Sequence, residues 1–463
     1  MQASFTNLFG CTGNRVDKEI TPSRLRVVPT LPKRGNLQKS LKNQKLIMVL
    51  LVLLSLSAPE YAMGYTTGKV IDFVTGKPVS NAYVTLDNNI VFTDENGMFV
   101  LKNMGNKIAV RAYGYLRNEQ IIIAPLITLP LEIKLMPFTP KALYLSPYGI
   151  GSRVLRGSAL RLIEETELNA LVIDIKGDRG FIPYKSLIPL AREVGSQKII
   201  TVRDMNDLIK SLKGKGIYLI ARIVVFKDNP LALTMPDLSI KTASGEIWRD
   251  GEDLAWVDPF RKEVWNYNIN IAVEAAQYGF DEIQFDYVRF PDAAGLKFSM
   301  ESTEENRVKA ISGFLMEAKK RLMPYNVFLA ADIFGYVCWN INDTKIGQKL
   351  ENLASSVDYM SPMLYPSGFH FGIPGYRNPV AYPYEIVYLS IKRAQERTNI
   401  SPVRFRPWLQ AFSDYAFDKR RFTGREIRDQ INAAEKFGSN GWMLWNSHNT
   451  YSGDGLKKDA LKK

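Results

Sequence analysis

The sequence FDEIQFDYVRFP at residues 280–291 begins like a buried strand and ends in charged residues. A β-strand sends alternate side chains to opposite faces, so Ile283 and Phe285 form an apolar face. Gln284 and Asp286 then share the other face. Asp286 stands where the apolar run ends, and in parallel α/β barrels the carboxyl ends of strands carry the active site. An Asp that only caps the next turn, or pairs with the arginine three positions later, is the alternative at this point.

Around this stretch, strand-like and helix-like segments alternate from Lys141 onward, which predicts a parallel sheet. Eight segments are expected to be strands: 142–146, 170–175, 218–225, 282–287, 327–333, 359–364, 404–409 and 441–445. Seven are expected to be helices: 155–167, 205–213, 259–278, 303–323, 345–355, 380–398 and 424–437. Eight such units predict a (β/α)8 barrel of the TIM type over residues 141–450. An open doubly wound sheet is the alternative, but no strand precedes a G-x-G-x-x-G turn or a Walker loop.

Residues 65–136 show a different pattern, with short alternating strands separated by Gly, Pro, Asn and Asp turns. This pattern predicts a small all-β sandwich. The opening V-x-D-x-x-T-G-x-P-V-x-x-A-x-V from Val70 and the turn T-D-x-x-G-x-F from Thr93 resemble the carboxypeptidase regulatory-like domain, a transthyretin-like sandwich. That resemblance implies a spacer or binding module without catalysis. Because the link at Pro137–Pro140 is rich in proline, we expect the sandwich and the barrel to be separable.

The positive charge of the chain is concentrated near its start. Residues 1–45 hold nine Lys or Arg against two acids, a net +7 of the total +13, so +6 is spread over all the rest. A nucleic-acid surface is therefore not expected. The apolar run 46–56 that follows predicts a signal peptide cleaved near Ala58 or Ala62, or an uncleaved membrane anchor over 46–58. We expect residues 1–62 to be a basic tail with this sorting element, residues 451–463 to be a basic tail, and the protein to be extracytoplasmic.

Polar or aromatic side chains mark the carboxyl ends of most of the predicted barrel strands. These candidates are Asp174, Lys176, Arg222, Asp286, Arg289, Asp332, Tyr365, Trp408, Gln410, Trp445 and His448. A buried polar group costs free energy unless it is paired, so convergence of so many on one barrel face favours an active site.

The chemistry open to these groups is narrow. The chain has two histidines, no G-x-S-x-G elbow, no His-x-x-x-His and no cysteine cluster, which argues against a Ser–His nucleophile and against zinc. No metal or cofactor is expected. Glycosidases need two carboxyl groups, one protonated and one ionised. Asp286 and Asp332 end adjacent strands and form the natural pair, with Asp174 as a third candidate. Trp408, Trp445 and Tyr365 offer sugar-stacking faces, although packing inside the barrel explains each of them equally well.

Five motifs resemble the bacterial "putative glycosyl hydrolase domain" family: LVIDIKGDRG from Leu171, IARIVVFKD from Ile220, WVDP from Trp256, QFDYVRFP from Gln284 and ADIFG from Ala331. The resemblance implies a TIM-type barrel related to the α-amylase-like glycosidases. It implies Asp286 as the nucleophile and Asp332 as the general acid, a position where relatives usually carry Glu.

We therefore expect an exported glycosidase that cleaves a polysaccharide. Nine side chains are expected to bind the substrate: Asp174, Lys176, Arg222, Arg289, Tyr365, Trp408, Gln410, Trp445 and His448. A carbohydrate-binding barrel without turnover and a transglycosidase are the alternatives.

Overall fold

The computed structural model describes residues 65–87, 89–102, 105–122 and 130–459. Its first part is a β-sandwich of two sheets, with strand orders β4-β1-β7 and β3-β2-β5-β6. The strands are β1 (Thr66–Asp72), β2 (Tyr83–Leu86), β3 (Asn89–Phe92), β4 (Met98–Leu101), β5 (Lys107–Arg111), β6 (Asn118–Ile121) and β7 (Leu131–Leu135). All neighbouring strands pair antiparallel except β1 and β7, which run parallel. The predicted sandwich is therefore present, while its relation to the carboxypeptidase regulatory-like domain stays a prediction.

Turn chemistry explains the sharp connection between β3 and β4. The Asp94 carboxylate accepts hydrogen bonds from the backbone N–H groups of Asn96 and Met98 at 2.9 and 2.8 Å. Gly97 lies in the left-handed region at φ 75°, and a Cβ there would meet the Val70 carbonyl oxygen at 2.5 Å. Glycine is the residue that tolerates both conditions. The T-D-x-x-G-x-F signature is thus the sequence of a tight turn.

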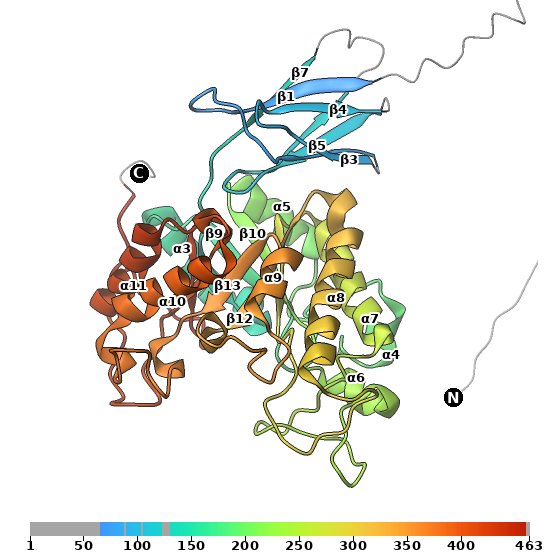
Figure 1. The fold of residues 1–463 in the computed structure, drawn as a ribbon, viewed down its shortest axis with the longest axis vertical. Coiled ribbons are helices and arrows are strands. Elements are labelled where there is room, and N and C mark those ends of the chain that lie inside the picture. Colours follow the sequence, from blue (N-terminus) through green and yellow to red (C-terminus); the bar gives the residue numbers. More distant parts are fainter. Residues whose placement is uncertain (1–64, 88, 103–104, 123–129, 460–463) are drawn as a thin grey trace, which may run out of the picture. The chain divides into compact units, whose positions relative to one another are not determined.

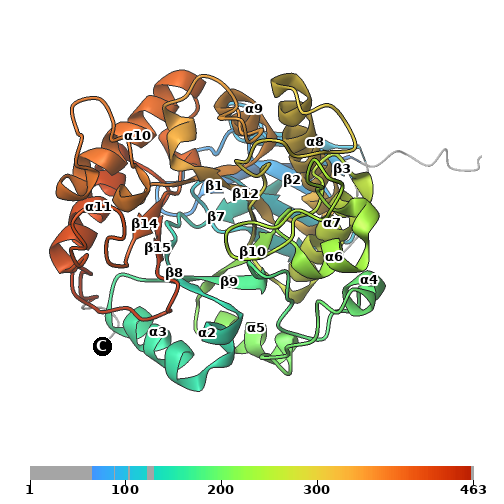
Figure 2. The same ribbon diagram turned by 90° about the horizontal axis from the view of Figure 1, so that it is seen from below.

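The second part is a closed barrel of eight parallel strands in the order β10-β11-β12-β13-β14-β15-β8-β9 (Figure 2). Its strands are β8 (Lys141–Leu145), β9 (Ala170–Lys176), β10 (Tyr218–Val224), β11 (Glu282–Asp286), β12 (Phe328–Phe334), β13 (Tyr359–Met363), β14 (Trp408–Gln410) and β15 (Trp442–Trp445). The predicted fold class, a (β/α)8 barrel preceded by a small β-sandwich, is confirmed.

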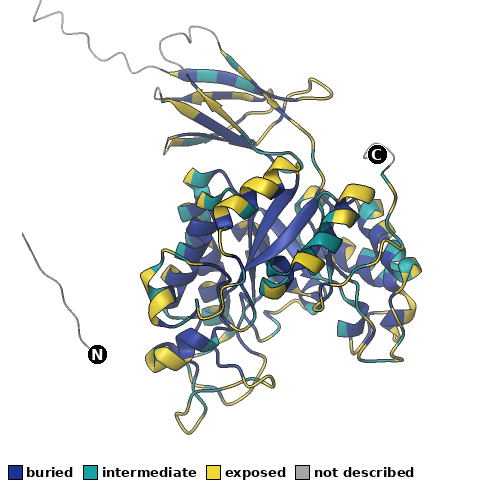
Figure 3. Ribbon diagram, turned by 180° about the vertical axis from the view of Figure 1, so that it is seen from behind, coloured by how far each residue is buried: buried dark blue, intermediate teal, exposed yellow. Residues whose placement is uncertain are grey.

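Helices surround these strands as a ring (Figures 1 and 2). They are α2 (Pro147–Gly151), α3 (Arg153–Glu165), α4 (Pro189–Glu193), α5 (Met205–Gly214), α6 (Asn229–Thr234), α7 (Lys262–Tyr278), α8 (Glu304–Leu322), α9 (Leu350–Ser356), α10 (Pro383–Thr398) and α11 (Gly424–Phe437). Figure 3 shows buried strands and helices that turn exposed residues outward. The main apolar core lies between strands and helices, and a smaller one fills the barrel interior.

The alternation within each strand explains these two cores. In β9, Leu171 and Ile173 belong to the outer core and Val172 to the inner one. The same parity turns Asp174 inward, at a point where it lies 1% exposed. Strand β11 behaves alike, because Ile283 and Phe285 belong to the outer core while Gln284 donates to Ser361 on β13 at 3.1 Å.

Two predicted elements are shorter than expected. The seventh strand covers only Trp408–Gln410, because Pro402–Arg404 forms a 3₁₀ turn and Pro407 has no N–H for a ladder bond. The predicted helix 345–355 begins only at Leu350. Lys345 has φ 58° and Gly347 has φ 79°, so the segment before it is a turn.

Residues 63–463 cluster into one compact unit that includes sandwich and barrel. The Arg117 guanidinium pairs with Asp281 at 3.2 Å, and the Gly114 N–H donates to the Tyr359 hydroxyl at 3.1 Å. The separability of the two parts stays a prediction. The predicted sorting element, residues 46–58, lies outside the described residues. Within the described ranges, no helix has the length and apolar character needed to cross a membrane.

Candidate active site

A single buried arginine organises the carboxyl end of the barrel. Arg222 projects from β10 and is 1% exposed. Its Nη1 donates to Asp174 at 2.7 Å, and its Nε and Nη2 donate to Asp286 Oδ2 at 3.0 and 2.6 Å. Its Nη2 also donates to Asp178 at 2.8 Å. Burial opposes the charge on Arg222, but the three carboxylates outweigh burial and raise the pKa of the guanidinium well above its ordinary value.

Asp286 is fixed from both of its carboxylate oxygens. Oδ2 receives the two hydrogen bonds from Arg222, and Oδ1 accepts the backbone N–H of Tyr287 at 2.6 Å. Tyr287 lies in the left-handed region at φ 47°, which is uncommon for a bulky residue and costs about 1–3 kcal/mol. Strain of this kind gathers at functional sites, and here it lies directly beside the candidate nucleophile.

Asp332 lies deeper than predicted. It is 1% exposed, and its Oδ1 accepts a hydrogen bond from Trp408 Nε1 at 2.7 Å. Its Oδ2 has no hydrogen-bond partner among the described residues and lies 3.9 Å from Arg222 Nε. Asp286 lies 3.0 Å from the same nitrogen, so the two carboxyl groups are neighbours. Burial and the negative charge of Asp286 raise the pKa of Asp332 well above its ordinary value. The positive charge of Arg222 lowers this pKa but does not cancel the rise. The environment of Asp332 therefore favours its neutral form.

Asp174 is a second carboxyl group that holds a proton near neutral pH. It accepts hydrogen bonds from Arg222 and, at 2.7 Å, from the Tyr144 hydroxyl. Burial raises the pKa of Asp174 to about 7, with Arg222 acting against that rise and Asp178 adding to it. A carboxyl group with a pKa near 7 suits general acid–base chemistry at neutral pH.

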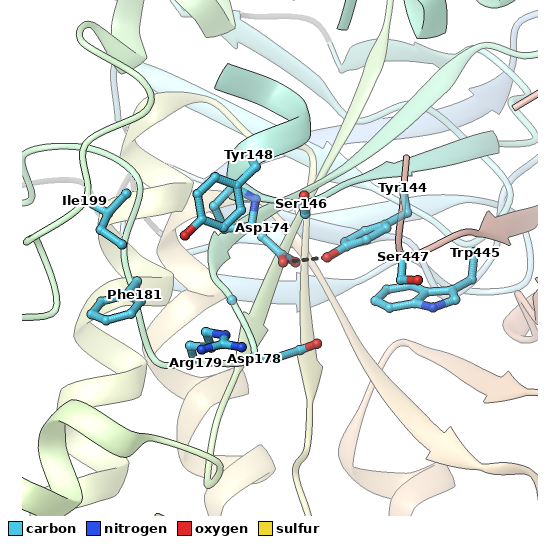
Figure 4. A pocket seen from close by; sticks show the side chains of 12 residues that line it. Tyr144, Ser146, Tyr148, Asp174, Asp178, Arg179, Phe181, Ile199, Trp445 and Ser447 are labelled. Atoms are coloured by element: carbon cyan, nitrogen blue, oxygen red, sulfur yellow. Dashed lines mark hydrogen bonds between the residues drawn. The ribbon is translucent and has the colours of Figure 1, made fainter. Parts of the chain in front are cut away.

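Two adjoining cavities open at this end of the barrel. The first, about 390 Å³, is lined by Asp174, Asp178 and the aromatic residues Tyr144, Tyr148 and Trp445, among others (Figure 4). The second, about 250 Å³, contains on its wall Arg222, Asp286, Tyr287, Arg289, Tyr365 and Trp408. Both share Asp178 and Trp445, so the two cavities adjoin, and together they are called the cleft below.

Aromatic rings frame this cleft. Trp445 stacks on Tyr144 with ring centroids 3.9 Å apart and lies 4.8 Å from the Arg222 guanidinium carbon. In Figure 4 the Tyr148 and Phe181 rings lie across the first cavity from Trp445. Such rings can bind the apolar faces of sugars.

Most predicted site residues come together here, and three do not. Lys176 is fully buried against Asp228 at 2.6 Å and lines neither cavity. The strand register shifts after Asp174, so its expected parity with Lys176 is lost. Gln410 is buried between Ser367 and Gln430, and His448 is exposed outside both cavities. The expectation that these three line the substrate site is not met. Asp332, the expected general acid, also lines neither cavity.

Several lining residues were missed by the sequence analysis. Tyr144 is the second-last residue of β8 and has the same inward parity as Ala142, a signal that the pattern of that strand contains. Asp178, Arg179 and Phe181 follow β9 in a loop, where no periodicity reports which way a side chain points. Within the described part of the chain, no group of three or more His, Cys, Asp or Glu could hold a metal ion. The carboxylates at the mouth surround an arginine instead.

A (β/α)8 barrel with carboxyl groups at its open end is an arrangement that suits glycoside hydrolysis. The family model described as "Putative glycosyl hydrolase domain" matches residues 142–451, and the chain belongs to this family. No curated protein matches the chain.

Among solved structures, a hypothetical protein from Ruminiclostridium thermocellum is 39% identical, over 41% of this chain and 96% of that one, with a TM-score of 0.37. The PgaB (BpsB) glycoside hydrolase domain from Bordetella bronchiseptica is 15% identical, over 68% and 95%, with a TM-score of 0.50, a likeness of fold. The spore cortex-lytic enzyme SleL from Bacillus cereus is 13% identical, over 77% and 86%, with a TM-score of 0.42.

Proposed function

We propose that this protein is a glycoside hydrolase that cleaves the glycosidic bonds of a polysaccharide with two carboxyl groups. The observation that carries the proposal is the arrangement around Arg222. One guanidinium binds three carboxylates at the open end of the barrel, and all three, Asp174, Asp178 and Asp286, line the two cavities. Three carboxylates beside a cavity favour chemistry.

Asp286 supplies the negative charge in this mechanism. Arg222 stabilises its ionised form, and the Tyr287 N–H fixes its orientation. An ionised carboxylate held in this way attacks the anomeric carbon or activates a water molecule. The left-handed backbone at Tyr287 helps to set the direction in which Asp286 faces.

The proton comes from a carboxyl group that is neutral before the bond breaks. Asp332 suits this role, because burial and the neighbouring Asp286 raise its pKa well above the ordinary value. Asp174 suits the role as well and also lines the first cavity, where a leaving oxygen is within reach. We therefore propose Asp174 as the proton donor and keep Asp332, which our sequence analysis favoured, as the alternative.

The test uses the full chain and a panel of envelope polysaccharides, with release of reducing ends as the readout. Wild type should release reducing ends from at least one polysaccharide, and Asp286→Asn should release none while still binding it. A carbohydrate-binding barrel would bind the glycan and release nothing even as wild type. A transglycosidase would give products longer than the substrate, which chromatography of the products would detect.

We also propose that the enzyme acts outside the cytoplasm. The support is the apolar run 46–56, with basic residues before it, although this segment lies outside the described residues. Cell fractionation tests the proposal, and full-length soluble protein in the cytoplasm would contradict it.

A further inference from the structure

Arg289 lines the second cavity without a carboxylate partner. It follows Asp286 by three residues and is half-buried on the same wall. Its only hydrogen bond to a described residue runs from Nη1 to the Phe290 carbonyl oxygen at 3.1 Å. It forms no ion pair with any described residue, whereas Arg222, on the same wall, forms four contacts of this kind.

The acidic residues near Arg289 are committed to other partners or are exposed to solvent. Both Asp286 oxygens are occupied by Arg222 and the Tyr287 N–H. Asp250 pairs with Lys227 at 2.9 Å and accepts the Trp256 Nε1–H at 2.9 Å. Asp292 is exposed on the surface. None of these three carboxylates forms an ion pair with Arg289.

The guanidinium is nonetheless held in place. Its central carbon lies 5.1 Å from the centroid of the Trp256 ring and 5.2 Å from that of Tyr287. The Trp256 ring is itself anchored by its bond to Asp250. Burial lowers the pKa of Arg289, which is the mark of a cation that lost water without gaining a full counter-charge. An anion in the cavity would supply that charge.

The first cavity repeats this feature. Arg179 is exposed on its wall and has no hydrogen bond or ion pair with any described residue (Figure 4). The two cavities adjoin at Asp178 and Trp445. Each of the two adjoining cavities thus has on its wall one arginine without a carboxylate partner among the described residues. Two such cations in adjoining cavities suit a polymer with repeated negative charges.

We infer that the cleft takes an acidic glycan, and that Arg289 binds a sugar carboxylate beside the bond to be cleaved. The inference rests on the proposed function for its ligand class. The planar guanidinium matches a carboxylate with two parallel hydrogen bonds, which a hydroxymethyl group cannot replace. A neutral sugar would leave Arg289 without a counter-charge in a partly closed cavity. Discrimination between acidic and neutral glycans follows.

The test compares two matched probes by calorimetry on the full chain. One is a mixture of oligogalacturonates, and the other is the same mixture after reduction of its carboxyl groups to primary alcohols. Wild type should bind the acidic mixture about tenfold tighter or more. Arg289→Gln should lose most of this preference, and Arg289→Lys, which keeps the charge without the planar fork, should retain part of it. Melting temperatures of both variants establish that they fold.

Arg393→Gln is the control. Arg393 is an exposed arginine on α10 that lines neither cavity, so its removal changes net charge alone and should leave the preference intact. Equal binding of the two mixtures by wild type, or a preference that survives Arg289→Gln, would overturn the inference. A sulfated neutral oligosaccharide that binds tighter than the uronates would overturn the carboxylate assignment. Binding needs no turnover, so reducing-end release from neutral glycans alone would refute this inference and leave the proposed hydrolase standing.

Discussion

Strand β11 carries an acidic residue at each end, and each of them pairs with an arginine. One arginine binds a single carboxylate, whereas the other is shared by several. At the amino end of the barrel, Glu282 pairs with Arg406, and both side chains are fully buried. Arg406 binds the side chain and the carbonyl oxygen of Asn440 at 2.8 Å each, and Tyr218 donates to Glu282 at 3.0 Å. At the carboxyl end, Asp286 shares Arg222 with two further carboxylates beside a cavity.

The difference separates packing from chemistry. One carboxylate for one arginine, sealed from solvent, balances charge, although burial raises the pKa of Glu282 above its ordinary value. At the carboxyl end, burial raises the pKa of Asp174 to about 7, with Arg222 acting against this rise and the nearby Asp178 adding to it. Arginine–carboxylate pairs alone therefore do not identify an active site, and we propose that the excess of carboxylates beside a cavity marks it here.

The largest expected effect is the loss of turnover in Asp286→Asn. The amide keeps the shape but loses the charge, so kcat should fall by about 10³-fold or more. Glycan affinity should remain, and the melting temperature should change little. Glu282→Gln is the matched control on the same strand, and its activity per folded molecule should stay near wild type. A melting temperature that falls in parallel with activity in Asp286→Asn would assign Asp286 a structural role.

Stability should respond at the other end of the barrel. Arg406→Met leaves Glu282 as a buried charge without its partner, which costs about 3–5 kcal/mol of unfolding free energy. Urea unfolding measures this change. Turnover per folded molecule should be unaffected, because Arg406 lines neither cavity. A fall in kcat without a fall in stability would break the contrast between the two ends.

An intermediate effect is expected for the proton donor. If Asp174 donates, activity on substrates with poor leaving groups falls as the pH rises above about 7, because its carboxyl group is then ionised. Asp174→Asn should lower that activity about 100-fold, abolish the alkaline limb and spare activated aryl glycosides. An alkaline limb that survives in Asp174→Asn and vanishes in Asp332→Asn would transfer the role to Asp332.

The same carboxyl group makes stability depend on pH. The pKa of Asp174 is about 7 in the folded state, against an ordinary 3.8. Folding between pH 3.8 and pH 7 is therefore accompanied by the uptake of a proton. The contribution of this carboxyl group to stability is thus complete below pH 3.8 and is lost as the pH rises towards 7. Urea unfolding of wild type and Asp174→Asn across this range should show a steeper decline in the wild type.

The smallest effect is expected from Asp178. Its side chain is 38% exposed, so solvent screens its pairing with Arg222. Asp178→Asn should change kcat by less than about fivefold. It should also move the alkaline limb to lower pH, because removing a nearby negative charge lowers the pKa of Asp174. A shift to higher pH would contradict the assignment of that limb to Asp174.

The barrel could be predicted from the sequence because its signals are local and repeated. Each strand alternates, and α11 begins and ends at the predicted residues Gly424 and Phe437. The seventh strand was predicted over too many residues, since Pro407 removes a donor that the apolar pattern does not reveal. Strand order and side-chain parity also predict that Asp286 on β11 lies close to Arg222 on β10.

Depth and loop direction could not be predicted in this way. Asp332 has the parity of a barrel-interior residue, but the pattern does not say that Trp408 covers it. The strand register shifts beside Asp174, so Lys176 does not share the inward direction of Asp174. A strict alternation of side chains along a strand assumes that no such shift occurs. The loop residues Arg179 and Phe181 acquire their place only through the packing of neighbouring loops.

Several carboxyl groups share Arg222, so one of them cannot be changed without affecting the others. The titrations of the acidic groups around Arg222 are coupled, so the removal of one carboxyl group changes how readily the others hold a proton. Measured titration constants then belong to the group as a whole, and effects of single substitutions will not add. The roles of the carboxyl groups should be assigned with double substitutions whose activity is measured across pH. Comparing Asp174→Asn combined with Asp332→Asn against each single substitution reports how many protons these groups share.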